Sequence, residues 1–248
     1  MAFMWDQHVR EAPIVIGGVG GSGTRMIAQL LQSNGVDIGS ALNESMDNLW
    51  FTLLFRRPSW KKERVCSLEI LKACRVLGAA HYGNGYEDIP LDVKNYIIDL
   101  AENMPNFGLK GSPFGSWLDV AHHLLNHRYN HYTNGLWGWK EPNSHMFLPE
   151  IMVTFLKLKY VHVIRNGVYM SRSSNQNQLN QWGLWFGDEV DAGGDVSERS
   201  TQFWCASNLN ARRICESSLA DQHFWLKFED LCSDPKSVAT DLLSLIHI

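Results

Sequence analysis

The apolar positions are most regular near the start of the chain. A short apolar run, residues 14–16, predicts a strand. A glycine-dense turn follows it, and from Thr24 onward apolar side chains recur at helical spacing: Met26, Ile27, Leu30 and Leu31. Asn34-Gly35 then supplies a signal for the C-terminal end of a helix. The pattern therefore predicts a strand, a loop and a helix in succession.

The pattern changes in the middle of the chain. Residues 43–135 carry helical patches and no clear strand. Helical periodicity is present at 68–77 and at 117–125, and Ser116 is placed to cap the second of these helices. We expect a largely helical segment here.

Strands and helices alternate after residue 135. The predicted elements are a helix from Pro149, a strand at 160–164, a helix after the turn 165–167, a helix at 201–215, a strand at 224–228, and a helix from Asp234-Pro235 to Leu245. Such alternation implies a parallel sheet with helices on both faces. The expected fold class is α/β: a three-layer α/β/α domain over residues 1–248, with 43–135 as a helical insertion. Ligands of such sheets bind beyond the carboxyl ends of the strands.

One acidic, glycine-bearing segment, residues 183–200, interrupts two helical stretches. We expect it to be a surface loop or a lid over the substrate.

The composition limits the classes of function that this protein can have. With 248 residues, 45% of them hydrophobic, the chain can form one sizeable domain, and a net charge of −4 argues against wholesale nucleic-acid binding. There is no run of 18 apolar residues, and the N-terminus lacks the order of a signal peptide, so we expect no membrane span. Five cysteines without a C-x-x-C pair are typical of reduced thiols, so the expected location is cytoplasmic.

The glycine-dense turn predicts an anion site. Its glycines let the backbone approach an anion closely, and the N-terminus of the following helix directs unpaired N–H groups at it. The bound group is therefore expected to be a phosphate or a sulfonate, unless the turn only joins strand to helix.

Three kinds of phosphate loop compete for this turn. The G-x-G-x-x-G of residues 18–23 matches a dinucleotide fingerprint, but Asp37 does not follow the second strand that this fingerprint requires. A Walker loop needs Lys and then Ser or Thr where this chain has Thr24 and Arg25. A loop that holds a nucleotide through its backbone and Arg25, without a metal, fits the residues best.

A metal site is not expected. His123, His127 and His131 recur at i, i+4 spacing, but no acidic third ligand follows at motif spacing.

A second anion-binding pair follows the strand at 160–164. Arg165 leaves the end of that strand, and Ser173 comes eight residues later, in the next predicted helix. An arginine fork and a serine hydroxyl together can clamp one phosphate.

These two segments, GVGGSGTRMIAQLL and KYVHVIRNGVYMSRSS, resemble the sulfotransferases that use 3′-phosphoadenosine 5′-phosphosulfate (PAPS). WLKFEDLCSDPKSVATDLL is similar to the family's C-terminal pattern, and GWKEPNSHMFLPEI to its Lys-x-Pro segment. The matches run from Pro13 to Leu245 without the middle third. The Gly-Thr-Arg ending of the loop is closest to the carbohydrate-directed branch.

The resemblance implies a P-loop-type fold and assigns roles to the two anion sites. The first loop would bind the 5′-phosphosulfate, through Gly20, Gly21, Ser22, Gly23, Thr24 and Arg25. Arg165 and Ser173 would bind the 3′-phosphate. No metal is expected, because cations of the protein neutralise the charge.

The chain departs from the family in two places. Many members carry Lys or Arg in the loop, where this chain has Gly20 and Gly21; Lys140, at the Lys-x-Pro position, is the best substitute for contacting the sulfonate or the leaving oxygen. The family's late glycine- and arginine-containing segment is not found before Ile248, so it is absent or the sequence is truncated.

The general base has several candidates. Glu44 lies, within one residue, where the carbohydrate branch has a glutamate, and Asp47 competes with it. Other branches use a histidine after the Lys-x position, where this chain has Pro142; His145, three residues further on, is the second choice.

The expected function is metal-independent, in-line transfer of a sulfonate group from PAPS to a hydroxyl or amine of a small or carbohydrate acceptor. The alternatives are a P-loop small-molecule kinase and a nucleotide-binding module of the same fold without turnover. No nucleic acid or membrane partner is expected, and the sequence predicts neither the identity of the acceptor nor the oligomeric state.

Overall fold

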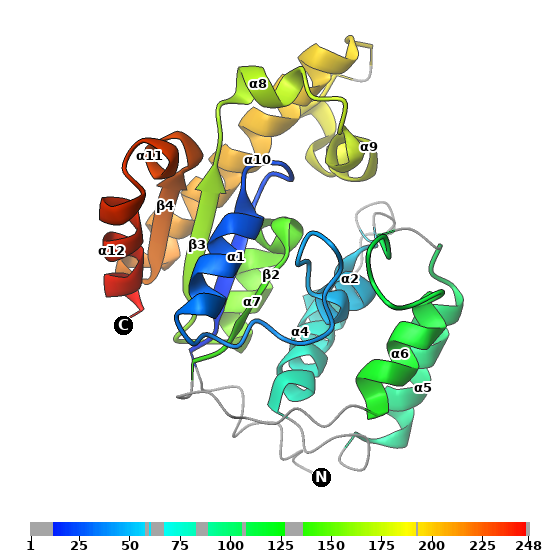
Figure 1. The fold of residues 1–248 in the computed structure, drawn as a ribbon. Coiled ribbons are helices and arrows are strands. Elements are labelled where there is room, and N and C mark those ends of the chain that lie inside the picture. The colour runs from blue at the N-terminus through cyan, green and yellow to red at the C-terminus, as the bar shows by residue number, and fades with distance from the viewer. Residues whose placement is uncertain are drawn as a thin grey trace.

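A central sheet of four parallel strands organises the molecule (Figure 1). The structure, a computed structural model, describes residues 12–57, 60, 67–82, 89–105, 108–126, 136–191 and 193–246. The strand order is β2-β1-β3-β4. The strands are β1 (Ile14–Gly18), β2 (Gly138–Lys140), β3 (Lys159–Ile164) and β4 (His223–Lys227). The predicted α/β class with a parallel sheet is confirmed.

Helices account for most of the remaining described residues. Between β1 and β2 lie α1 (Thr24–Ser33), α2 (Leu49–Phe55), α4 (Ser67–Tyr82), α5 (Leu91–Glu102) and α6 (Trp117–Asn126). Between β2 and β4 lie the 3₁₀ helix η4 (Pro142–Phe147), α7 (Leu148–Thr154), α8 (Gly167–Ser171), α9 (Asn177–Trp182), the 3₁₀ helix η5 (Gly183–Glu189), α10 (Val196–Ser218) and η6 (Ala220–Gln222). The chain continues after β4 with α11 (Phe228–Ser233) and α12 (Pro235–Leu245).

Alternating residues of the strands face two cores. Ile14 and Ile16 of β1 pack with residues of α1 and α12, whereas Val15 packs with residues of η4, α7 and α10. The second core continues into the helical segment, where Trp50 of α2 and Trp117 of α6 are fully buried. Helices therefore cover both faces of the sheet, as Figure 1 shows, and α2, α4, α5 and α6 lie together at one end.

The register sets the positions of the candidate site residues. Lys140, the last residue of β2, pairs with Ile16, and Val163 of β3 pairs with Gly18 at the end of β1. Arg165 follows two residues after Val163. Because the strands are parallel, their carboxyl ends meet at one edge, where α8 and α9 also lie (Figure 1).

Three local predictions need correction. Residues 138–140 form a strand that was not predicted, since three residues are too few to display a pattern. The loop predicted at 183–200 is largely helical, with Trp185 packed on Phe147 and Phe186 packed on Phe203, and the alternative that this stretch covers the substrate as a lid stays a prediction. Helix α10 starts at Val196 and not at residue 201, with the Asp195 carboxylate accepting from the N–H of Glu198.

Candidate functional site

The glycine-dense turn joins β1 to α1 and is open at its helical end. Gly21 and Gly23 have φ angles of +93° and +101°, a region that favours glycine. A Cβ at Gly23 would lie 2.3 Å from the ring of Phe228, so no side chain fits there. No side chain caps the start of α1. Its first N–H groups therefore have no side-chain partner and are available to an anion.

The side chains of this loop divide between the interior and the surface. Ser22 and Thr24 are buried, and the Ser22 hydroxyl has no hydrogen-bond partner among the described residues. Arg25 is exposed, and its Nη2 donates to the Ser45 hydroxyl over 3.0 Å. Arg25 is thus held beside the segment that leads into α2.

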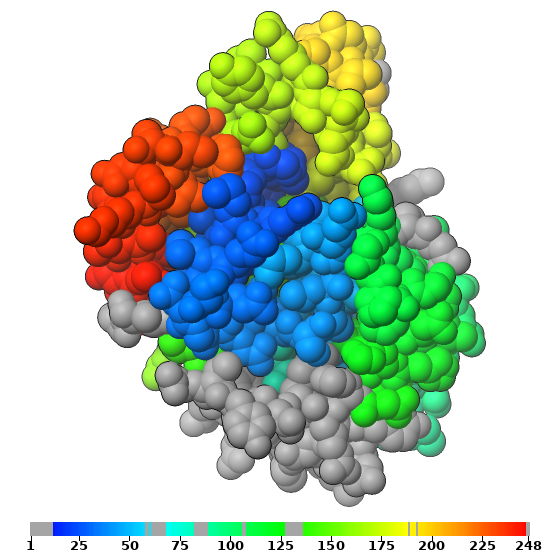
Figure 2. All heavy atoms as spheres, in the orientation of Figure 1, coloured from blue at the N-terminus to red at the C-terminus, as the bar shows by residue number. Residues whose placement is uncertain are grey.

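Arg165 lies against the same loop. Its Nη1 donates to the carbonyl oxygen of Gly21 over 3.2 Å, and its guanidinium lies 4.8 Å from the centre of the Phe228 ring. In Figure 2 the surface of the N-terminal segment, in blue, lies between those of α8 and α11. Two segments 144 residues apart in sequence therefore meet at one surface.

Ser173 differs from its prediction. It lies two residues beyond the end of α8 and not in a helix, and it is exposed. Its hydroxyl accepts from the N–H of Asn175 over 3.2 Å. The described residues show no hydrogen bond between Ser173 and Arg165, so a joint clamp of these two side chains remains a prediction.

Lys140 is buried at the carboxyl end of β2. Its side chain is 3% exposed and forms an ion pair with Asp47, whose side chain is 20% exposed. Its Nζ also donates to the carbonyl oxygen of Ser45 over 2.9 Å. An ammonium group has three N–H donors. The third has no partner among the described residues.

Glu141 is a buried carboxylate that the sequence analysis did not select. Both of its oxygens accept from Asn143, one from the backbone N–H over 2.6 Å and one from Nδ2 over 2.8 Å. Burial and the nearby Asp47 raise the pKa of Glu141 to about 7, against the opposing effects of Arg56 and Lys140. The Lys-Glu-Pro order at the end of an apolar segment was the signal that could have identified it.

Gln178 of α9 contacts the glycine-dense turn between β1 and α1, residues 18–23, which is called the phosphate loop from here on. Its Oε1 accepts from the N–H of Gly20, and its Nε2 donates to the side-chain oxygen of Asn143 over 2.7 Å. A Cβ at Gly20 would lie 3.0 Å from the Gln178 carboxamide carbon. The carboxamide therefore stands where a side chain at residue 20 would begin.

The two predicted bases are in different environments. Glu44 is exposed, in the same segment as Ser45 and Asp47, and its N–H donates to the carbonyl of Lys110 over 3.3 Å. His145 is fully buried, with its ring 6.0 Å from that of His162 and its Nε2 without a hydrogen-bond partner among the described residues. Burial lowers the pKa of His145 to about 4.

Two other predictions concern metals and membranes. Of the three histidines considered as metal ligands, His127 and His131 lie outside the described residues, and His123 packs against Phe114. Within the described ranges, no group of three or more His, Cys, Asp or Glu is placed to hold a metal. Nor does any described helix have the length and apolarity to cross a membrane.

Comparison with known proteins identifies the family. A sequence model of the sulfotransferase family matches residues 13–248. No curated protein sequence matches the chain.

Solved structures of similar fold include three sulfotransferases. The sulfotransferase domain from the curacin biosynthetic pathway is 16% identical, with a TM-score of 0.48, over 96% of this chain and 75% of that one. That of the Synechococcus PCC 7002 olefin synthase is 14% identical, with a TM-score of 0.46, over 100% and 78%. A sulfotransferase from Mycobacterium tuberculosis is 12% identical, with a TM-score of 0.45, over 98% and 70%.

The family match covers nearly the whole chain, including both segments that are predicted to bind anions and the strand that carries Lys140. The chain therefore belongs to the sulfotransferase family of enzymes.

Proposed function

We propose that this sulfotransferase moves the sulfonate group of PAPS to a hydroxyl or amine of a small or carbohydrate acceptor. The observation that carries the proposal is the contact between Arg165 and the phosphate loop at Gly21. A donor with phosphates at both the 3′ and 5′ positions needs two cationic or N–H-rich sites close together. A nucleotide triphosphate would need only the first.

The residues present fit such a donor. The open start of α1 and the N–H groups of Gly21, Gly23 and Thr24 offer donors for the 5′-phosphosulfate, with Arg25 at their side. Arg165 would bind the 3′-phosphate, and the exposed Ser173 hydroxyl would complete that site by a movement of the segment between α8 and α9.

PAPS supplies an activated sulfonate whose leaving group is a stable bisphosphate. In the transfer, a bond forms between the acceptor oxygen or nitrogen and sulfur, and the bond between sulfur and the 5′-phosphate oxygen breaks. We assign Lys140 to the charge that develops on that oxygen, because its ammonium group is fixed by Asp47 and the Ser45 carbonyl and has a third N–H.

Glu44 is the base that we propose to take the acceptor proton. It is exposed in the segment whose neighbouring residues touch Arg25 and Lys140, so an acceptor can reach it. Asp47 is already paired with Lys140. His145, the second choice, is enclosed in the core, which supports Glu44 over it.

We place the acceptor on the side of the helical segment. The backbone of Glu44 contacts Lys110, and the Nδ2 of Asn43 donates to the carbonyl of Gly108 over 3.1 Å. Residues 108–110, which lie between α5 and α6, therefore adjoin the proposed base. This contact supports the helical insertion as the substrate side.

A thermal-shift comparison tests the donor. Adenosine 3′,5′-bisphosphate should raise the melting temperature without added metal, whereas ATP with magnesium and NAD should not. Stabilisation by ATP with magnesium alone would instead support the kinase alternative. If the bisphosphate stabilises the protein, the variant Glu44→Gln should keep that response and lose turnover of PAPS with an acceptor panel. Wild-type binding without turnover on any acceptor would favour the nucleotide-binding module.

A further inference from the structure

We propose that Glu141 is a positioning residue for sulfonate transfer, which acts through Asn143 and Gln178 on the phosphate loop at Gly20. The inference rests on the proposed function, because it concerns how the same loop is held for the donor. It assigns a role to three side chains that lie outside both predicted anion sites.

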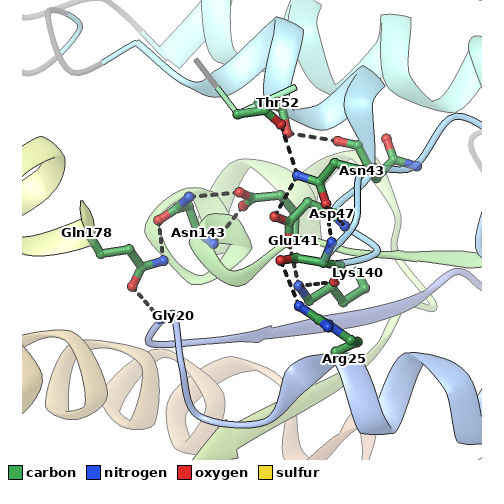
Figure 3. A network of polar contacts seen from close by, with 12 residues as sticks. Gly20, Arg25, Asn43, Asp47, Thr52, Lys140, Glu141, Asn143 and Gln178 are labelled. Atoms are coloured by element: carbon green, nitrogen blue, oxygen red, sulfur yellow. Dashed lines mark hydrogen bonds and ion pairs between the residues drawn. The ribbon is translucent and has the colours of Figure 1, made fainter. Parts of the chain in front are cut away.

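The three side chains form one continuous chain of hydrogen bonds (Figure 3). The Gly20 N–H donates to Gln178, Gln178 donates to Asn143, and Asn143 donates to Glu141. Every donor points in the same direction, towards the carboxylate. Hydrogen bonds arranged in this way polarise one another, so the negative charge at one end strengthens the contact at the other.

The common direction of these hydrogen bonds depends on the ionised form of Glu141. A carboxylate only accepts hydrogen bonds, and here both of its oxygens accept from Asn143. This fixes the Asn143 amide with its oxygen towards Gln178. The Gln178 amide is fixed in turn with its oxygen towards Gly20. Protonation of Glu141 would remove one acceptor position and release this constraint.

This row of hydrogen bonds reaches the loop at Gly20, one of the two positions where the Lys or Arg of many family members is missing from this protein. The carboxamide of Gln178 occupies the space beside Gly20 and bonds to its N–H. At the other end, Glu141 directly follows Lys140 in sequence, and its own N–H donates to the carbonyl of Ile16 over 3.1 Å. The row of hydrogen bonds therefore connects the phosphate loop with the strand β2, which ends at Lys140.

Three charged groups lie near Glu141. Lys140 lies on β2, Asp47 on the segment before α2, and Arg56 directly after α2. Arg56 also donates to Gln181 of α9 through Nε and Nη2, over 2.8 and 2.6 Å. Burial and Asp47 raise the pKa of Glu141, so its ionisation falls within the pH range in which the enzyme can be assayed.

The test is to reverse the direction of the hydrogen bonds that link Gly20 to Glu141. Glu141→Gln and Gln178→Glu each break the uniform direction and should each lower kcat/KM for PAPS about tenfold. In the double variant the carboxylate at 178 accepts from Gly20 and Asn143, and the amide at 141 donates to Asn143. The double variant should therefore recover to within about threefold of the wild type. Asn180→Glu, an exposed amide on the same helix, is the control for added charge and should change kcat/KM less than twofold.

A double variant no better than the worse single variant would overturn the inference. A pH profile adds a readout that simple packing would not affect: turnover of the wild type should fall as Glu141 takes up its proton near pH 7, and that step should be missing in Glu141→Gln. An unchanged step would also count against it.

Further measurements distinguish a failure of the proposed function from a failure of the inference about Glu141. If wild-type protein does not bind adenosine 3′,5′-bisphosphate, the proposed function fails. Whether residues 141 and 178 are coupled is then still decided by unfolding midpoints of the same four proteins. If Glu141→Gln does not fold, Gln178→Ala is used instead, and its dissociation constant for the bisphosphate should rise about tenfold; an unchanged constant would contradict the inference.

Discussion

Gly23 shows how strongly a single residue can constrain the phosphate loop. Its backbone lies in the left-handed region, and the ring of Phe228 lies where its Cβ would be. The Phe228 ring also lies beneath the Arg165 guanidinium. The same aromatic side chain therefore closes the loop on one side and supports a proposed phosphate ligand on the other.

Replacing Gly23 should be costly. We expect Gly23→Ala to lower the free energy of unfolding by more than about 2 kcal/mol, because backbone strain adds to the collision with Phe228. Urea denaturation would measure this loss.

Gly35 provides the matched control. Its φ is also positive, at +87°, but nothing lies within 4 Å of a Cβ at that position. Gly35→Ala should therefore show only the strain, roughly 1 kcal/mol. Equal losses in the two variants would contradict the importance of the Phe228 contact.

Sequence reasoning found the residues of the site unevenly. Arg165 was predicted because it follows a strand of a parallel sheet, where position follows from topology, whereas Lys140 was selected because it occupies the Lys-x-Pro position of the family that the sequence resembles. Gln178 was missed because its proximity to Gly20 depends on the path of the chain after α8. Ser173 was placed in a helix that ends earlier, since Arg172 and Ser173 carry no signal for its end.

Among the elements, helix α6 confirms a capping prediction. Ser116 precedes the helix, and its hydroxyl accepts from the N–H of Asp119 over 3.1 Å while donating to the Asp119 carboxylate over 2.8 Å. Asp234 does the same for α12, where its carboxylate accepts from the N–H of Ser237 over 3.1 Å. Local caps of this kind are readable from sequence because their partners are three residues apart.

Removal of the α6 cap gives an element-scale prediction. Ser116→Ala should lower the free energy of unfolding by about 1 kcal/mol, because one N–H at the helix start loses its partner. Ser116→Asp retains an acceptor and should remain within a few tenths of a kcal/mol of the wild type. The two variants are compared by urea denaturation. An equal loss in both would mean that the cap does not stabilise the helix.

Strand β2 shows why other elements were missed. It has only three residues, and its place in the sheet depends on Gly138, where a Cβ would lie 1.9 Å from the carbonyl oxygen of Ile14. That close approach is a long-range contact without a local pattern. The stretch 183–200 illustrates the converse, since its acidic residues and glycines suggested a loop while its aromatic residues Trp185 and Phe186 pack against the core.

For the whole molecule, two buried histidines link stability to pH. Burial lowers the pKa of His145 to about 4 and that of His162 to about 3. Below the ordinary histidine pKa of about 6.5, the unfolded chain takes up protons that the folded chain does not. Stability should therefore fall as the pH is lowered from about 6.5 towards 4. Glu141 opposes part of this change, because its pKa is raised in the folded state.

The variant His145→Leu isolates one of these contributions. When the pH is lowered from 7 to 5, the free energy of unfolding of the wild type should fall by roughly 2 kcal/mol more than that of this variant. His122→Ala, which removes an exposed histidine, should leave the wild-type dependence unchanged. Urea denaturation at the two pH values measures both. An unaltered dependence in His145→Leu would show that this residue is not held neutral by burial.

The central claim is that the phosphate loop and Arg165 hold the two ends of one donor. Titration calorimetry with adenosine 3′,5′-bisphosphate, without metal, tests it most directly. We predict binding by the wild type, at least tenfold weaker binding by Arg165→Ala because a charged hydrogen bond is lost, and unchanged binding by Arg212→Ala, which removes an exposed arginine paired with Glu216. Equal affinities for the wild type and Arg165→Ala would contradict the claim.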